Sequence, residues 1–176
     1  TRVVTASYDG TARLWDSKTG ASLASLKGHT NWVLAASFSP DGTRVVTASY
    51  DGTARLWDSK TGASLASLKG HTNSVLAASF SPDGTRVVTA SYDGTARLWD
   101  SKTGASLASL KGHTNSVLAA SFSPDGTRVV TASYDGTARL WDSKTGASLA
   151  SLKGHTNSVL AASFSPDGTR VVTASY

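Results

Sequence analysis

An internal repeat constrains the fold of this chain more than any other feature. Successive copies open with the same threonine, at Thr1, Thr43, Thr85, Thr127 and Thr169. The 176 residues therefore hold four periods of 42 residues (1–42, 43–84, 85–126 and 127–168) and a partial fifth, 169–176. Periods of this length indicate an array in which each copy forms one supersecondary unit and packs against its neighbours. We expect the array of repeats in residues 1–176 to form a single domain.

Each period has the pattern of four short strands. In the first copy, Val3–Tyr8 and Thr11–Trp15 are rich in β-branched and aromatic residues, and Asp9-Gly10 between them predicts a hairpin turn. Ala21–Leu26 and Trp32–Ser39 predict two further strands. Strands at this spacing, with no sustained helical period, predict an all-β protein.

Composition excludes several functional classes. The chain has no cysteine, which excludes disulfides and thiolate chemistry. The net charge of +5 arises from about one interspersed positive charge per period, which is typical of a solvated surface, so nucleic acid is not the expected partner. No apolar stretch is long enough to span a membrane, and we expect a cytoplasmic protein.

Four short motifs recur together at the same period. In one copy they are GHT at Gly28–Thr30, SFSPDG at Ser37–Gly42, TASYDG at Thr47–Gly52 and RLWD at Arg55–Asp58. With this order and spacing, the chain resembles the WD40 repeat family along its whole length. The resemblance implies a β-propeller of four-stranded antiparallel blades, in which strand a lines the central channel and strand d forms the rim. On that scheme the chain runs b-c-d, then a-b-c-d three times, then a-b.

The resemblance also implies a hydrogen-bonded set of His, Thr, Asp and Trp within each blade. The sets are His29, Thr47, Asp51 and Trp57; His71, Thr89, Asp93 and Trp99; and His113, Thr131, Asp135 and Trp141. Ser49 and its equivalents are alternatives for the Thr position. A buried imidazole and indole need such partners. Because the set recurs in every blade, a structural role is expected rather than a catalytic one, and single histidines on separate blades do not predict a metal site. We expect no cofactor.

Other repeated side chains divide into core and surface. Val33, Leu34, Phe38, Val45, Val46 and Leu56 are expected to pack between neighbouring blades. The tyrosine before each b–c turn is expected on the top face near the channel. The candidate contact residues for a protein, peptide or polyanion are Tyr8, Tyr50, Tyr92, Tyr134 and Trp32. A structural role, in which each tyrosine only covers the b–c turn, is an equally good alternative to contact with a partner.

Near-identity of the copies bears on origin. Trp32 stands where the other copies have Ser74, Ser116 and Ser158, and it is the one position that varies. Natural repeats diverge, so identity favours a designed symmetric scaffold without catalytic activity. The alternative is an interaction module from a natural WD40 protein with recently amplified blades. The isolated Trp32 suggests deliberate placement.

The number of blades predicts an assembly. Propellers close with about four to eight blades, and an open row of four would leave apolar faces exposed at both ends. We expect a head-to-tail homodimer that closes a ring of eight blades. Rings of four, seven or nine blades are the alternatives. A fourth set would then be shared between chains, with His155 and Thr173 from one and Asp9 and Trp15 from the other. One b strand per junction would be surplus.

Overall fold

The computed structural model describes residues 1–176 as five antiparallel sheets without a helix. We name the sheets blades I to V in chain order. Blade I contains β1 (Arg2–Ala6), β2 (Ala12–Asp16) and β3 (Ser22–Leu26). Blade II contains β4 (Val33–Phe38), β5 (Arg44–Ser49), β6 (Ala54–Asp58) and β7 (Ser64–Leu68). Blade III contains β8 (Val75–Phe80), β9 (Arg86–Ser91), β10 (Ala96–Asp100) and β11 (Ser106–Leu110).

Blade IV repeats the same arrangement and blade V contains half of it. Blade IV contains β12 (Val117–Phe122), β13 (Arg128–Ser133), β14 (Ala138–Asp142) and β15 (Ser148–Leu152). Blade V contains β16 (Val159–Phe164) and β17 (Val171–Ser175). The strand order confirms the predicted all-β class and the run b-c-d, three times a-b-c-d, then a-b.

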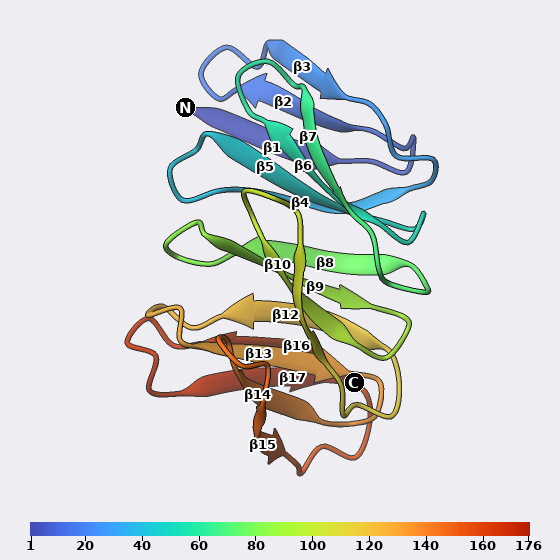
Figure 1. The fold of residues 1–176 in the computed structure, drawn as a ribbon, viewed down its shortest axis with the longest axis vertical. Helices are drawn as coiled ribbons and strands as arrows, with labels where there is room; N and C mark the ends of the chain where they lie inside the picture. Colours follow the sequence, from blue (N-terminus) through green and yellow to red (C-terminus); the bar gives the residue numbers. More distant parts are fainter.

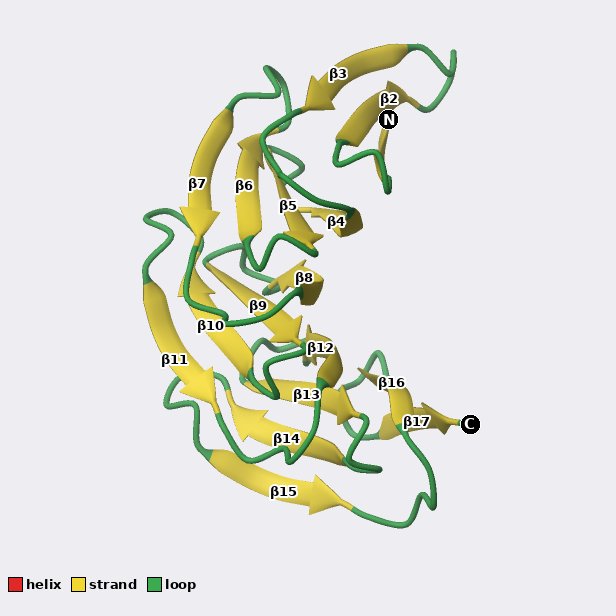
Figure 2. Cartoon of the chain, turned by 90° about the vertical axis from the view of Figure 1, so that its right-hand side faces the viewer, coloured by secondary structure: helices red, strands yellow, loops and turns green.

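The blades follow one another along an open arc (Figures 1 and 2). In Figure 2, strands a (β4, β8, β12 and β16) line the concave side, and strands d (β7, β11 and β15) lie on the convex side. Both termini lie on the open side of the arc. The b–c turns and the loops leading into strands a lie at one end of the strands, which we call the top face. The a–b turns and c–d loops form the bottom face.

The b–c turn contains the predicted Asp9-Gly10 pair and extends beyond it. In blade I, β1 ends at Ala6 and β2 begins at Ala12, and the Gly10 N–H donates to the Ser7 carbonyl at 3.3 Å. Gly10 has a φ of +82°, whereas no residue other than glycine has a positive φ. A two-residue type I′ turn requires positive φ at both central residues, which Asp9 does not adopt. The predicted hairpin with Asp9-Gly10 in its turn is confirmed, and the turn is longer than these two residues.

The hydrophobic core lies between blades. One cluster joins Val46 and Leu56 of blade II to Val87 and Trp99 of blade III, and equivalent clusters lie between the other neighbouring blades. Each four-stranded sheet is therefore covered on both faces. The core prediction holds for five of its six residues. Val33, Val45, Val46 and Leu56 are buried in the clusters between blades, and half-buried Phe38 packs against one of them, whereas half-buried Leu34 belongs to none. Both half-buried residues lie on β4, which lines the concave side of the arc.

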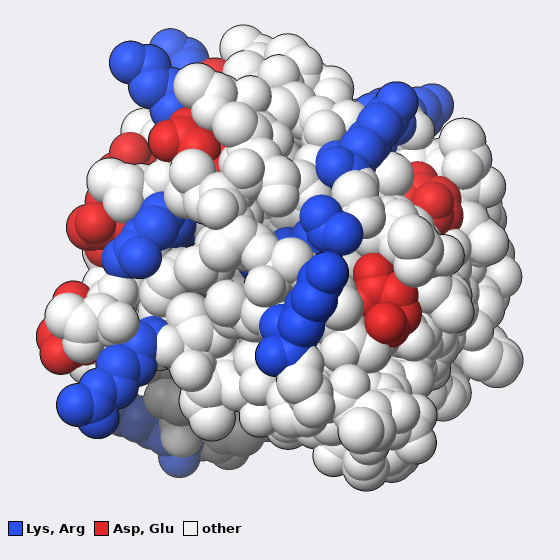
Figure 3. Space-filling model, turned by 90° about the horizontal axis from the view of Figure 1, so that it is seen from below, with Lys and Arg blue, Asp and Glu red and all other residues white.

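The two ends of the arc leave apolar side chains exposed. Val3 on blade I is 46 % exposed, although its equivalents Val45, Val87 and Val129 are fully buried. Val172 on blade V is 66 % exposed. Figure 3 views the arc from its C-terminal end, where uncharged side chains make up most of the surface and Lys and Arg lie in separate groups. The structure contains no helix that could cross a membrane.

Candidate functional site

The blade II set links four side chains from four segments of the chain. His29 lies in the loop before β4, Thr47 on β5, Asp51 in the b–c turn and Trp57 on β6. His29 Nδ1 lies 2.8 Å from Asp51 Oδ2, and His29 Nε2 lies 2.7 Å from Thr47 Oγ1. The indole N–H of Trp57 donates to Thr47 Oγ1 at 2.9 Å. The Thr47 hydroxyl therefore joins the histidine to the tryptophan.

The structure brings the same residues together in blades III and IV. The His Nδ1 to Asp distance is 2.7 Å in both blades. The His Nε2 to Thr distances are 2.8 and 2.7 Å, and the Trp to Thr distance is 2.9 Å in both. The residues are His71, Thr89, Asp93 and Trp99 in blade III, and His113, Thr131, Asp135 and Trp141 in blade IV.

The alternative hydroxyl has a different partner. Ser49 Oγ donates to the Asn31 carbonyl at 3.1 Å and accepts the N–H of Asp51. Ser49 thus holds the b–c turn against the loop before β4, and it does not contact His29.

Electrostatics keeps each set in one protonation state. Burial lowers the pKa of the His29 imidazole below its usual value, in spite of the opposing effect of Asp51, and the Arg55 charge lowers it further. Burial raises the pKa of the Asp51 carboxyl, but hydrogen bonds from Thr53 and His29 outweigh this, and the pKa lies below its usual value. Neutral histidine with the proton on Nδ1 donates to the carboxylate and accepts the Thr47 hydroxyl proton. Every polar atom of this chain of bonds then has a partner.

This arrangement offers little to a substrate. The His29 side chain is buried, and its two ring nitrogens are engaged by Asp51 and Thr47. The Thr47 hydroxyl is buried as well and already accepts from Trp57. General-base chemistry needs a reacting group within hydrogen-bond reach of the histidine. The chain also contains no cluster of three His, Cys, Asp or Glu side chains that could hold a metal ion.

The fourth set is divided between the two ends of the chain. His155 Nε2 lies 2.7 Å from Thr173 Oγ1 in blade V, and no carboxylate faces His155 Nδ1. In blade I, the Trp15 indole donates to Thr5 Oγ1 at 2.8 Å. Asp9 binds the N–H and hydroxyl of Thr11 through Oδ1. The structure therefore does not bring His155 and Thr173 together with Asp9 and Trp15 within one chain.

The aromatic candidates lie side by side along the top face. Trp32 stacks on Tyr8 with ring centroids 4.7 Å apart and lies 5.4 Å from Tyr50, which is 5.9 Å from Tyr92. Tyr8 is 68 % exposed, Trp32 45 % and Tyr134 40 %. The hydrogen bond to Tyr50, together with burial, raises the pKa of Tyr92 to about 12, so the phenol stays neutral at physiological pH.

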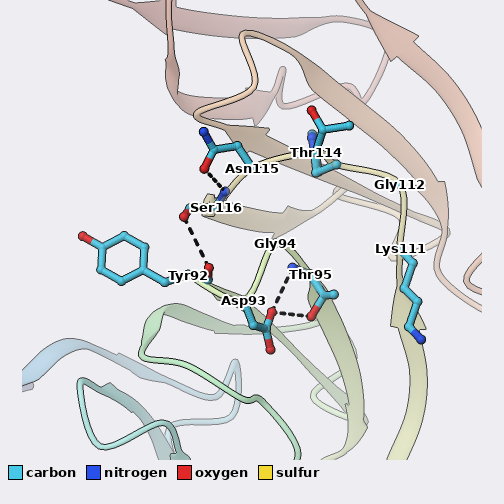
Figure 4. A pocket seen from close by; sticks show the side chains of 10 residues that line it. Tyr92, Asp93, Gly94, Thr95, Lys111, Gly112, Thr114, Asn115 and Ser116 are labelled. Carbon is cyan, nitrogen blue, oxygen red and sulfur yellow. Dashed lines mark hydrogen bonds between the residues drawn. The ribbon is translucent and has the colours of Figure 1, made fainter.

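Polar grooves separate the turns on the same face. One groove, of about 460 Å³, lies between the b–c turn of blade III and the loop leading into blade IV (Figure 4). Tyr92 to Thr95 and Lys111 to Ser116 line it. A groove of about 430 Å³, lined by the equivalent residues one period earlier, lies between blades II and III. In Figure 4, Lys111 and Tyr92 lie at opposite ends of the groove.

Comparison with known proteins accounts for the repeated blade. The family described as WD domain, G-beta repeat matches residues 1–16, 20–58, 62–100, 104–142 and 146–176. The chain belongs to the WD40 repeat family. Members of this family are generally non-catalytic, and the repeats imply a protein-interaction module.

Individual relatives match about one WD40 repeat each. Ribosome assembly protein 4 from Chaetomium thermophilum is 56 % identical over 41 residues, which is 23 % of this chain and 8 % of that protein. Nuclear distribution protein PAC1 from Mycosarcoma maydis is 52 % identical over 40 residues, which is 23 % of this chain and 9 % of that protein. The matched segment thus spans less than a tenth of the length of these relatives.

One repeated contact between WD40 blades could not be predicted from a local sequence pattern. At the start of each strand b, an arginine reaches the next blade: Arg44 Nη1 donates to the Ser101 carbonyl at 2.6 Å, and Nη2 donates to the Gly84 carbonyl at 3.0 Å. Arg86 makes the same bond to Ser143 at 2.6 Å. In each copy the arginine and the serine are 57 residues apart. This constant separation is the one sign of the contact in the sequence, and no local pattern connects the two residues.

Proposed function

We propose that the chain is a designed symmetric WD40 scaffold without catalytic activity, which assembles head to tail into a homodimer with eight blades. The divided fourth set carries this proposal. His155 of one chain lacks a carboxylate, and Asp9 of another would stand where Asp51 stands beside His29. Near-identity of the repeats, apart from Trp32, supports a designed origin. A gene in which these repeats lie among unrelated natural domains would contradict the design.

The surfaces at the two ends support the same assembly. Because the repeats are identical, the contacts between inner blades are templates for the contact between chains. Arg128 donates to Gly168 at 2.7 Å but has no serine like Ser101 in the next blade. Ser17 of a second chain would occupy that position. The assembly would also cover one exposed valine, Val3 if β1 supplies strand b of the shared blade or Val172 if β17 does, and burial of such side chains favours association.

The junction has one strand too many. A complete blade at the junction takes strand a from β16 and strands c and d from the partner, but both β17 and the partner's β1 have the sequence of strand b. One of them must leave the sheet. The two copies have the same five residues, VVTAS at Val171–Ser175 and at residues 3–7, so neither has an intrinsic advantage.

Solution mass tests the assembly directly. Native mass spectrometry of the 176-residue chain should give twice the 18.1 kDa monomer. The double variant His155→Ala with Arg128→Ala should shift the equilibrium toward monomer, whereas Arg44→Ala, within one chain, should lower stability without separating the chains. A wild-type mass of one chain at all concentrations would overturn the dimer.

A second candidate function is protein or peptide binding through the top face, which the series Tyr8, Trp32, Tyr50 and Tyr92 favours. Exposed aromatic side chains are enriched at protein interfaces. Peptides selected on the chain from a random library should lose affinity when Tyr50 and Tyr92 are changed to Ser. Changing Leu65 and Leu107, each 52 % exposed on the rim strands, to Ser is the matched control. Equal loss in both variants would place the contact elsewhere.

A further inference from the structure

All carboxylates of this chain are used inside its own turns. Every acidic residue is an aspartate, and each accepts hydrogen bonds from nearby backbone N–H groups or hydroxyls. The ion pairs of the chain are the three His–Asp contacts, so no Lys or Arg is paired with a carboxylate. None of the 17 Lys and Arg side chains is thus paired with a carboxylate of the chain, although the arginines of strands b donate to backbone carbonyls of the next blade.

The unpaired charge is unequally divided between the two faces. On the top face of blade II, Arg55 and Lys69 stand against one carboxylate, Asp51. On the bottom face of the same blade, Arg44 and Lys60 stand against Asp41 and Asp58. The net positive charge of each period therefore lies on the top face.

The arginines of strands c supply part of this positive charge. The Nε atoms of Arg55, Arg97 and Arg139 are buried without a hydrogen-bond partner. A Cβ placed on Gly112 would lie 2.8 Å from Arg139 Nη1, so this guanidinium lies directly under the loop that lines the groove in Figure 4. Unpaired buried donors are rare in folded proteins.

Inside the groove, the carboxylate of Asp93 and the side-chain oxygen of Asn115 are occupied by hydrogen bonds from the chain itself. Asp93 Oδ2 accepts from His71 and Thr72, and Oδ1 accepts from Thr95. Asn115 Oδ1 accepts the N–H of Ser116 at 2.7 Å, which leaves its amide N–H groups without a partner in the groove.

The Tyr92 carbonyl accepts from Ser116 Oγ at 3.3 Å. The groups left for a ligand are the Lys111 ammonium, the Asn115 amide and the Thr114 hydroxyl. All three donate hydrogen bonds, so they fit an anionic acceptor.

We propose that these grooves bind carboxylate side chains from an acidic segment of a protein partner, with Lys69 and Lys111 as the anchoring cations. This inference rests on the proposed use of the top face as a contact surface. Each groove has one lysine, and successive grooves are one blade apart. Acidic side chains spaced along one peptide could therefore enter successive grooves. A nucleic acid would instead require a continuous track of positive charge along its backbone.

Fluorescence anisotropy tests the proposal with a labelled peptide of alternating Glu and Ser residues. At low ionic strength, the double variant Lys69→Gln with Lys111→Gln should weaken binding by about fivefold to tenfold. The matched control, Lys60→Gln with Lys102→Gln, removes the same charge from exposed sites on the bottom face and should leave binding unchanged. A peptide of alternating Gln and Ser should not bind.

Three outcomes would overturn the proposal. Equal weakening in both variants would indicate non-specific attraction, tighter binding of oligothymidylate would assign the face to nucleic acid, and no binding of the Glu peptide would exclude an acidic ligand. The tyrosine variants separate this failure from failure of the top-face function. If library peptides lose affinity in the Tyr50 and Tyr92 variant but not in the Lys69 and Lys111 variant, the top face is a contact surface. Only the proposal of an acidic ligand then fails.

Discussion

Blades II to IV and the two ends of the chain have the same residues in the same order, but the residues have different surroundings. Trp57 is fully buried between blades, whereas Trp15 on blade I is only half-buried. His29 contacts both a threonine and an aspartate, whereas His155 contacts only Thr173. The comparison shows that a blade of this family is completed by its neighbours, because each core cluster and each arginine bond involves two successive blades.

The largest difference between inner and end blades is expected from the tryptophans. Trp99→Ala should lower the free energy of unfolding by about 3–5 kcal/mol, because it empties a fully buried site between blades. In monomeric chains, Trp15→Ala should cost about half as much or less, since no blade covers it on one side. Urea unfolding at low protein concentration measures both. Equal losses in monomers would mean that the end blade is as well packed as the others.

Removing the central hydroxyl of a set should have the next largest effect. Thr89→Val keeps the shape but leaves the Trp99 indole and His71 Nε2 without a partner, at a cost of about 2–4 kcal/mol. Thr173→Val removes one exposed contact to His155 and should cost less than about 1 kcal/mol. Thr89→Ser retains the hydroxyl and is the control. A loss in Thr89→Ser as large as in Thr89→Val would mean that stability at this site does not depend on the hydroxyl in particular.

The arginines of strands b should show a smaller difference. Arg86→Ala removes a hydrogen bond to the Ser143 carbonyl and should destabilise the chain by about 1–2 kcal/mol. Arg170 is the same residue on the end blade, but no blade follows it, so Arg170→Ala should change the stability of monomeric chains by less than about 0.5 kcal/mol. Thermal unfolding of the two variants makes the comparison, and similar destabilisation would show that the bond between blades contributes nothing.

Acid should weaken the inner sets before the rest of the structure. Because the pKa values of His29, His71 and His113 are lowered in the folded chain, the unfolded chain binds protons first as the pH falls below about 6.5. Stability should be constant above this pH and fall below it. It should fall again below about 4, since the folded chain holds Asp51, Asp93 and Asp135 ionised.

Urea unfolding as a function of pH tests this order. The triple variant with Gln at positions 29, 71 and 113 should lose the first decline and keep the second. A first decline that persists in this variant would assign it to other groups.

The smallest expected effect belongs to the one position that differs between repeats. In Trp32→Ser, the new hydroxyl can donate to the Tyr8 carbonyl as Ser74 donates to Tyr50 at 3.1 Å, which offsets the lost stacking on Tyr8. Stability should change by less than about 0.5 kcal/mol. Tryptophan emission from accessible rings should decrease, because Trp57, Trp99 and Trp141 are buried and only the half-buried Trp15 remains accessible. A large destabilisation would show that Trp32 joins blades I and II.

Much of the fold could be predicted because the signal is repeated. The Thr-to-Thr period and the recurring GHT, SPDG and RLWD motifs predict the strand order and the divided blades. The geometry of the b–c turn could not be predicted from Asp9-Gly10, because the same dipeptide suits several turns and the surrounding Ser7 and Thr11 contacts decide among them.

The candidate site was less accessible to sequence reasoning. Thr47 and Ser49 are both hydroxyls on one strand, and only the structure shows that Thr47 faces His29 while Ser49 faces Asn31. The grooves were not foreseen, because Lys111 and Tyr92 come together only through the loop between two blades.

By itself, the sequence determined what each blade is made of: an all-β unit whose strands, turns and hydrogen-bonding side chains recur every 42 residues. Local preferences and hydrophobic alternation suffice for this, because they act within a few residues. Only the tertiary structure decided which copies of a residue are buried, paired or exposed. Val45 and Val3 have the same sequence neighbours, yet one is buried and the other is 46 % exposed, since burial depends on the blade beside it.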